Sequence, residues 1–173
     1  YEHAERVLRE STLSSNRDAV RTNLRFVYAP ERRRSIEVAH LALPTAANRP
    51  FADKLDAMLP FLDHGFVARF QRLVAALPVA SQHATSTILT AIRLIGEALN
   101  AATLADHEEC ADPSIMATAI EYLLMACDAA QEDLKIHLPN LLVPTSDGQT
   151  NFATRVAYDM YGRFKAPSND ILH

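Results

Sequence analysis

Residues 82–104, QHATSTILTAIRLIGEALNAATL, carry the clearest periodic signal in this chain. Apolar residues recur there at alternating intervals of four and three positions, and they are Ile88, Ile92, Ile95, Leu99 and Ala102. Because side chains three and four positions apart lie on one face of an α-helix, this spacing predicts a long amphipathic helix.

A second segment repeats the pattern. Residues 113–134, PSIMATAIEYLLMACDAAQEDL, align Met116, Ile120, Leu123, Cys127, Ala130 and Leu134. Asp112 is suited to cap this helix, and Pro113 fits its first position. Two long helices with matching apolar stripes and a short connection should pack as an antiparallel hairpin, which we expect at the centre of the fold.

Further helices are predicted on both sides of this hairpin. The periodic segments cover residues 2–13, 16–28, 30–43, 50–59, 63–77 and 151–164, and most of the nine prolines fall between them. No stretch alternates apolar and polar residues for long enough to indicate a strand. We therefore predict an all-α fold, an irregular bundle of seven to eight helices, with a single helical domain over residues 1–166 and a frayed tail over residues 167–173.

The composition is typical of a water-soluble globular domain. Hydrophobic residues make up 49% of the 173 positions and charged residues 22%, and glycine occurs only four times. A chain of this length buries a core without needing a metal or disulfide. Its apolar runs are too short to span a membrane, so we expect no membrane partner. The cysteine pair Cys110 and Cys127 is no disulfide framework, which favours an intracellular location, cytoplasmic or nuclear.

Charge is unevenly distributed along the chain. Residues 1–40 contain eight arginines against six acidic residues, whereas residues 81–130 contain Arg93 alone against seven. Arg17, Arg21 and Arg25 are four apart and would line one helical face, where they could meet phosphates or an acidic partner. Arg32, Arg33 and Arg34 begin the next predicted helix, where cations do not favour helix stability. The alternative interpretation is a solvated face whose arginines pair with nearby carboxylates.

The connection between the two long helices is acidic and contains Asp106, Glu108, Glu109 and Asp112 together with His107 and Cys110. These residues have the donor types of a metal site, but their spacing matches neither a calcium loop nor a structural zinc motif. No two of the seven histidines lie four apart, and no glycine-rich phosphate loop occurs. We therefore expect no metal, no cofactor and no catalytic residue, although a Cys–His or Ser–His pair assembled by the fold stays open.

The last predicted helix interleaves aromatic and basic residues, which are Arg155, Tyr158, Tyr161 and Arg163. Such residues can stack on nucleic-acid bases, or they can cover the edge of a core. Asp147-Gly148 followed by Ala157-Tyr158-Asp159-Met160-Tyr161 resembles the DG turn and Ala-Phe-Asp-Phe-Tyr helix of flexuous filamentous plant virus coat proteins. The resemblance covers residues 147–161 and implies helical assembly on RNA. The tryptophan-containing segments of that family have no counterpart upstream.

Two functional hypotheses follow. The first is a helical module for protein–protein interaction or self-assembly, in which the six arginines of the N-terminal face meet the acidic connection of another copy or of a partner. The alternative is a nucleocapsid-like or coat-like protein that packages RNA through the same arginines and the aromatic segment. We expect no enzyme.

Overall fold

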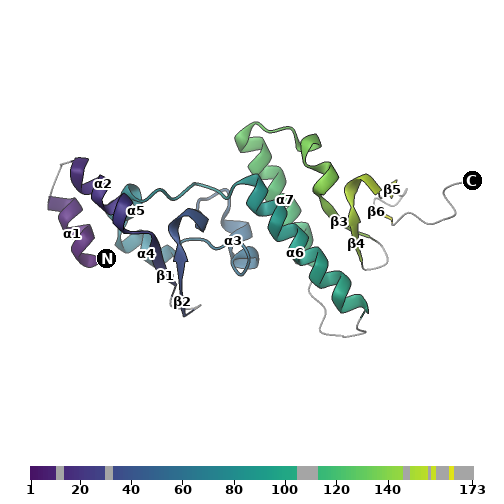
Figure 1. The fold of residues 1–173 in the computed structure, drawn as a ribbon, viewed down its shortest axis with the longest axis horizontal. Helices are drawn as coiled ribbons and strands as arrows, with labels where there is room; N and C mark the ends of the chain where they lie inside the picture. Colours follow the sequence, from purple (N-terminus) through teal and green to yellow (C-terminus); the bar gives the residue numbers. More distant parts are fainter. Residues whose placement is uncertain are drawn as a thin grey trace, which may run out of the picture. The chain divides into compact units, whose positions relative to one another are not determined.

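The computed structural model describes residues 1–10, 14–29, 33–104, 113–145, 149–155, 157–158 and 164–165 (Figure 1). These residues divide into two compact units, Tyr1–His83 and Ala84–His173, each of which is described by itself. The expectation of one domain over residues 1–166 stays a prediction, and the predicted tail over residues 167–173 lies outside the described residues.

The prediction of an all-α fold is wrong. The structure is mostly helical, but its described part also contains three antiparallel two-stranded sheets, so it is mixed α/β. The first sheet pairs β1(Phe26–Ala29) with β2(Arg34–Glu37), in the register Val27 opposite Ile36. Helices were predicted over residues 16–28 and 30–43. Aromatic and β-branched side chains favour strands, but each run is only four residues long and its pairing depends on non-local contacts.

The first unit combines this sheet with five short helices. They are α1(Glu2–Glu10), α2(Ser14–Asn23), α3(Arg49–Leu55), α4(His64–Arg69) and α5(Gln71–Ala76), and the 3-10 turn η1(Val38–His40) follows β2. A buried apolar cluster joins α1, the sheet and α5, and it contains Leu8, Val27, Ile36, Val38, Leu41, Leu62, Phe70, Leu73, Val74, Ala76 and Leu77. The helix predicted over residues 63–77 is divided at Phe70, whose backbone leaves the helical region.

One contact in this unit links α1 to the start of α5. The carboxylate of Glu5, only 6% exposed, accepts hydrogen bonds from the backbone N–H of Leu73 (2.7 Å) and of Arg72 (3.3 Å). The first N–H groups of a helix have no partner within the helix, and the positive end of its dipole favours an anion. Glu5 therefore caps α5 from another helix, which explains a buried carboxylate.

The second unit contains the predicted hairpin. The two long helices are α6(Thr85–Leu104) and α7(Pro113–Ala130), and they pack against each other. They run in opposite directions (Figure 1), and a hydrogen bond between Thr85 and Glu132 joins the start of α6 to the end of α7. The predicted inward residues that are buried are Ile88, Ile92, Ile95, Leu99, Met116, Leu123 and Cys127. Ala130 is exposed at the end of α7, and Leu134 lies beyond it.

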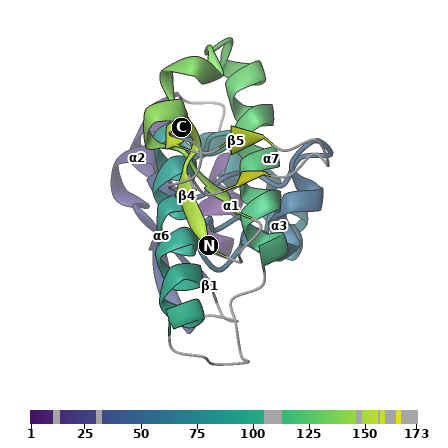
Figure 2. The same ribbon diagram turned by 90° about the vertical axis from the view of Figure 1, so that its right-hand side faces the viewer.

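Short turns and strands follow α7, and of these β3 and β4 pack against the helical hairpin. They are η2(Leu134–Ile136), η3(Leu138–Asn140), β3(Leu142–Pro144), β4(Thr150–Phe152), η4(Ala153–Arg155), β5(Ala157–Tyr158) and β6(Phe164–Lys165). The β3–β4 pair packs against α6 (Figures 1 and 2). The helix predicted over residues 151–164 is therefore wrong, because residues 150–152 pair with β3 instead of continuing a helix.

Among the described residues, no helix has both the length and the apolar character needed to cross a membrane.

Candidate functional site

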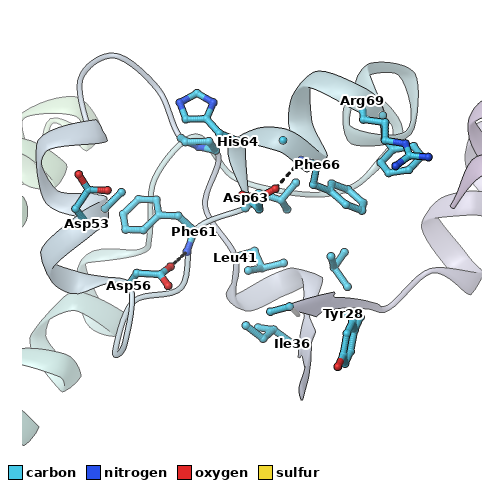
Figure 3. Close-up of a pocket in the computed structure, with 17 residues that line it drawn as sticks. Tyr28, Ile36, Leu41, Asp53, Asp56, Phe61, Asp63, His64, Phe66 and Arg69 are labelled. Atoms are coloured by element: carbon cyan, nitrogen blue, oxygen red, sulfur yellow. Dashed lines mark hydrogen bonds between the residues drawn. The ribbon is translucent and has the colours of Figure 1, made fainter. Parts of the chain in front are cut away.

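An apolar cleft lies in the first unit, between the β1–β2 hairpin and the segment that contains α3 and α4 (Figure 3). Its volume is about 810 Å³. Most of the lining side chains are apolar or aromatic, and they include Ile36, Leu41, Phe61, Phe66 and Phe70. A volume of this size is typical of small-molecule sites, and it also suits a few side chains of a partner protein.

Two of the three acidic residues that line the cleft, Asp56 and Asp63, have structural roles. Asp63 caps α4, because its Oδ1 accepts a hydrogen bond of 2.7 Å from the N–H of Phe66. Asp56 Oδ1 accepts one of 3.0 Å from the N–H of Phe61, and both bonds are visible in Figure 3. These carboxylates hold backbone N–H groups at the cleft wall, so they stabilise its shape.

The basic groups of the cleft are also engaged. The Arg69 guanidinium pairs with the Glu2 carboxylate, and His64 shares a hydrogen bond with Arg49. Among the described lining residues, no nucleophile stands beside a base. The mostly apolar and aromatic lining is typical of a binding surface.

The five predicted arginines that the structure describes are exposed, but Arg17, Arg21 and Arg25 do not form one helical line. Arg17 and Arg21 lie on α2, whereas Arg25 lies beyond its end, because the helix stops at Asn23. Arg21 is partly engaged, since its Nε donates a hydrogen bond of 3.1 Å to the carbonyl oxygen of Ala76. Within the described residues, no acidic side chain pairs with Arg17 or Arg25.

The β1–β2 hairpin of the first unit also carries exposed basic and aromatic side chains. Arg33 adopts a positive φ of 50° just before β2, and Arg34 begins that strand; both are exposed. Phe26 and Tyr28 alternate with buried Val27, so they project from the opposite face of β1 and are 51% and 50% exposed. Exposed aromatic side chains are one of the features that can mark a surface for a partner. Arg34 is paired with Ala29, so it projects from the Val27 side of the sheet, opposite Phe26 and Tyr28. From here on, the N-terminal face means the exposed residues named above taken together, which are Arg17, Arg25, Arg33, Arg34, Phe26 and Tyr28.

Several predicted site residues cannot be placed. Those outside the described residues are Arg32, Asp106, Glu108, Glu109, Asp112, Tyr161 and Arg163. Tyr158 belongs to β5, and Arg155 is exposed in η4, where its guanidinium lies 5.5 Å from the centre of the Phe152 ring. The structure therefore does not bring the predicted aromatic and basic residues of this segment onto one helix.

The structure also reveals polar residues that the sequence did not single out. His83 is buried, its Nε2 lies 3.1 Å from the carbonyl oxygen of Pro60, and its ring meets Phe61 edge-on. Burial lowers the pKa of His83, although hydrogen bonds to the carbonyls of Pro60 and His40 oppose the shift. In the second unit, Cys127, Glu132 and His137 come together. Neither His83 nor the cluster of Cys127, Glu132 and His137 belongs to a local sequence motif, because turns of the backbone bring their contacts together.

No family model, curated protein or solved structure matches this chain. The helix implied by the resemblance to flexuous virus coat proteins is also not formed at Ala157 and Tyr158, which are in β5. The function must therefore be argued from the residues of this chain.

Proposed function

We propose that this chain is a protein–protein interaction module that self-assembles, and that the N-terminal face of one copy binds the acidic segment 106–112 of another. The observation that carries the proposal is a set of exposed arginines, Arg17, Arg25, Arg33 and Arg34, without an acidic partner among the described residues. Elsewhere exposed arginines do pair, as Arg93 does with Glu97 at 3.6 Å. Unpaired like charges in one region favour association with an acidic surface.

The apolar side chains of the same region support binding affinity as well as attraction. Aromatic residues and arginine are the types most often found where binding energy is concentrated in protein interfaces. Phe26 and Tyr28 are half exposed on the hairpin that forms one wall of the cleft. An association that covered both rings and filled the cleft would add apolar burial to the charge pairing.

The charge balance of the chain favours a second copy as the partner. Residues 81–130 carry one arginine and seven acidic residues, and four of these acidic residues lie within 106–112. The opposite charges are therefore on different segments of the same chain. A contact between the two segments of different copies is head-to-tail, and it can repeat.

Sedimentation velocity at low and high salt tests this proposal. We expect association at low salt that weakens as salt rises, because exposed charges are screened. Arg34→Gln should reduce association, whereas Arg93→Gln, which removes the same charge from an exposed pair in the second unit, should not. Association of Arg34→Glu should be restored by Glu108→Arg in the same chain. A monomer at every salt concentration, or equal effects of the two arginine variants, would refute the proposal.

A second candidate function is RNA binding, and one observation favours it. The β1–β2 hairpin carries the exposed rings of Phe26 and Tyr28 on one side and the exposed Arg34 at its edge, and aromatic and basic residues are the types that bind single-stranded nucleic acid in other proteins. Fluorescence anisotropy with a labelled single-stranded RNA distinguishes the two. Binding by the monomer that falls steeply with salt and is lost in Tyr28→Ala supports RNA binding. Self-association of nucleic-acid-free protein supports the first proposal.

A further inference from the structure

We propose that Cys127, Glu132 and His137 bind a Zn²⁺ ion at the end of α7. One thiol, one carboxylate and one imidazole lie there with their ligand atoms within 4.8 Å of one another. These are the three side-chain types that bind zinc in proteins. The site is in the second unit and uses none of the residues of the N-terminal face, so it does not depend on the proposed self-assembly.

The end of α7 creates this cluster by reversing the chain. Gln131 adopts a positive φ of 57°, and its N–H bonds to the carbonyl oxygen of Asp128 at 3.1 Å. The N–H of Glu132 then donates to the carbonyl oxygen of Cys127 at 2.9 Å. This pair of hydrogen bonds is the Schellman ending of a helix, and it folds Glu132 back beside the residue five positions earlier.

A second local turn brings the histidine. Asp133 begins η2, because its Oδ1 accepts a hydrogen bond of 2.9 Å from the N–H of Lys135. The turn continues until the N–H of His137 bonds to the carbonyl oxygen of Leu134 at 2.9 Å. As a result His137 Nε2 lies 3.0 Å from Glu132 Oε2. Backbone hydrogen bonds, rather than the side chains alone, therefore place all three donors.

The donor separations are close to those that a tetrahedral zinc site needs. With Zn–N and Zn–O bonds of about 2.0–2.2 Å and a Zn–S bond of about 2.3 Å, the donors of such a site are roughly 3.4–3.6 Å apart. The nitrogen and oxygen at 3.0 Å need to separate slightly to admit the ion. The sulfur lies within 4.8 Å of both, so a shared ion would also draw it towards them.

The surroundings of the three residues fit a site that is open on one side. Cys127 is 3% exposed, whereas the side chains of His137 and Glu132 are 15% and 38% exposed. A zinc ion held there would have the protein on the thiol side and solvent beyond the carboxylate, so water would occupy its fourth position. Sulfur and nitrogen donors favour zinc over calcium and magnesium, which prefer oxygen donors alone.

Zinc binds a thiolate, so binding would displace the proton of the Cys127 thiol and release it to solvent.

Cobalt binding to the full chain tests the site, because a thiolate bound to Co²⁺ gives a near-ultraviolet charge-transfer absorption. We expect this absorption in the wild-type protein and its disappearance when Zn²⁺ is added. Cys110→Ser should keep it and Cys127→Ser should lose it, so these two variants identify the thiol. An absorption that survives Cys127→Ser, or is absent from the wild type, would overturn the proposal.

The remaining ligands are tested without altering the buried thiol. His137→Ala and Glu132→Gln should each weaken zinc affinity by at least the roughly tenfold effect typical of disturbing a metal site, while His40→Ala, an exposed histidine in the first unit, should not. Zinc should also raise the thermal unfolding midpoint of the wild type and of His40→Ala, but not that of His137→Ala. Equal zinc effects on these two variants would show that the Glu132–His137 contact serves only to close the helix end.

Discussion

Gly96, buried in the middle of α6, offers the most direct test of how the second unit is packed. Glycine weakens a helix interior, so its replacement by alanine would ordinarily stabilise α6 by about 1 kcal/mol. In this structure a Cβ at residue 96 would lie 2.7 Å from Cδ1 of Leu142 and 2.9 Å from Oγ1 of Thr150. The Cε of Met116 would be 3.1 Å away. The β3–β4 pair therefore occupies the space that the alanine methyl group needs.

The steric cost should exceed the gain in helix propensity. Overpacking a closed core costs about 1–3 kcal/mol, and the flexible ends of Leu142 and Met116 can give way only in part. Thr150 is less free, because its Oγ1 lies 3.1 Å from Asn100 Oδ1 and 3.3 Å from the Gly96 carbonyl oxygen. Displacing it would also cost about 1 kcal/mol of hydrogen bonding. We expect Gly96→Ala to lower the free energy of unfolding by about 2 kcal/mol after the propensity gain is subtracted.

Urea denaturation monitored by circular dichroism measures this change, and the thermal midpoint should fall by roughly 4–8 °C. Ala98→Gly, at an exposed position of the same helix, calibrates propensity alone and should cost about 1 kcal/mol. A Gly96→Ala protein that was as stable as the wild type, or more stable, would refute the close packing of β3–β4 on α6.

Three further changes probe single contacts. Glu5→Ala should destabilise the first unit by about 2 kcal/mol in urea unfolding, because the N–H of Leu73 loses a charged acceptor, and Glu5→Gln should cost less. Burial lowers the pKa of His83, so the unfolded chain takes up a proton first as pH falls below 6.5; the free energy of unfolding should decline there, and His83→Gln should flatten the decline. Gln131→Gly should raise the free energy of unfolding by about 0.5 kcal/mol, because glycine adopts a φ of 57° without the strain of a side chain; a loss of stability would contradict that conformation.

The long helices could be predicted because their signal is repeated within each segment. One face of α6 is marked by four apolar residues, all of them buried: Ile88, Ile92, Ile95 and Leu99. One residue that departs from the repeat therefore does not change the prediction of a helix.

The β1 strand has no such redundancy. Its four residues contain a single buried side chain, Val27, whose partner Ile36 comes from the other strand. This segment differs from the end of a helix only through its pairing with the other strand. Neither four-residue sequence predicts that pairing by itself.

The exposed arginines and the cleft also differ in how far the sequence predicts them. Arg17, Arg25, Arg33 and Arg34 are exposed, as their position in a charged region suggests, and their role in binding a partner stays a proposal. The cleft could not be predicted from the sequence, because its walls come from separate segments, the β1–β2 hairpin and the segment with α3 and α4. Phe66 was correctly expected to be an apolar helix residue, whereas Phe70 separates α4 from α5, and the cavity that both line depends on how far the β1–β2 hairpin lies from them.

The Cys127 cluster shows how one backbone conformation changes the chemistry that a sequence can support. Residues five apart on a continuous helix differ by roughly 140° around its axis, so the helix predicted to reach residue 134 would place Cys127 and Glu132 on different faces. The usual signal for ending a helix is glycine just beyond it, and glutamine occupies that position here. Because Gln131 takes the left-handed conformation, the helix stops, and Glu132 returns to the thiol. The three donors therefore lie together only because α7 ends before its apolar repeat does. Extending α7 by one turn would separate them.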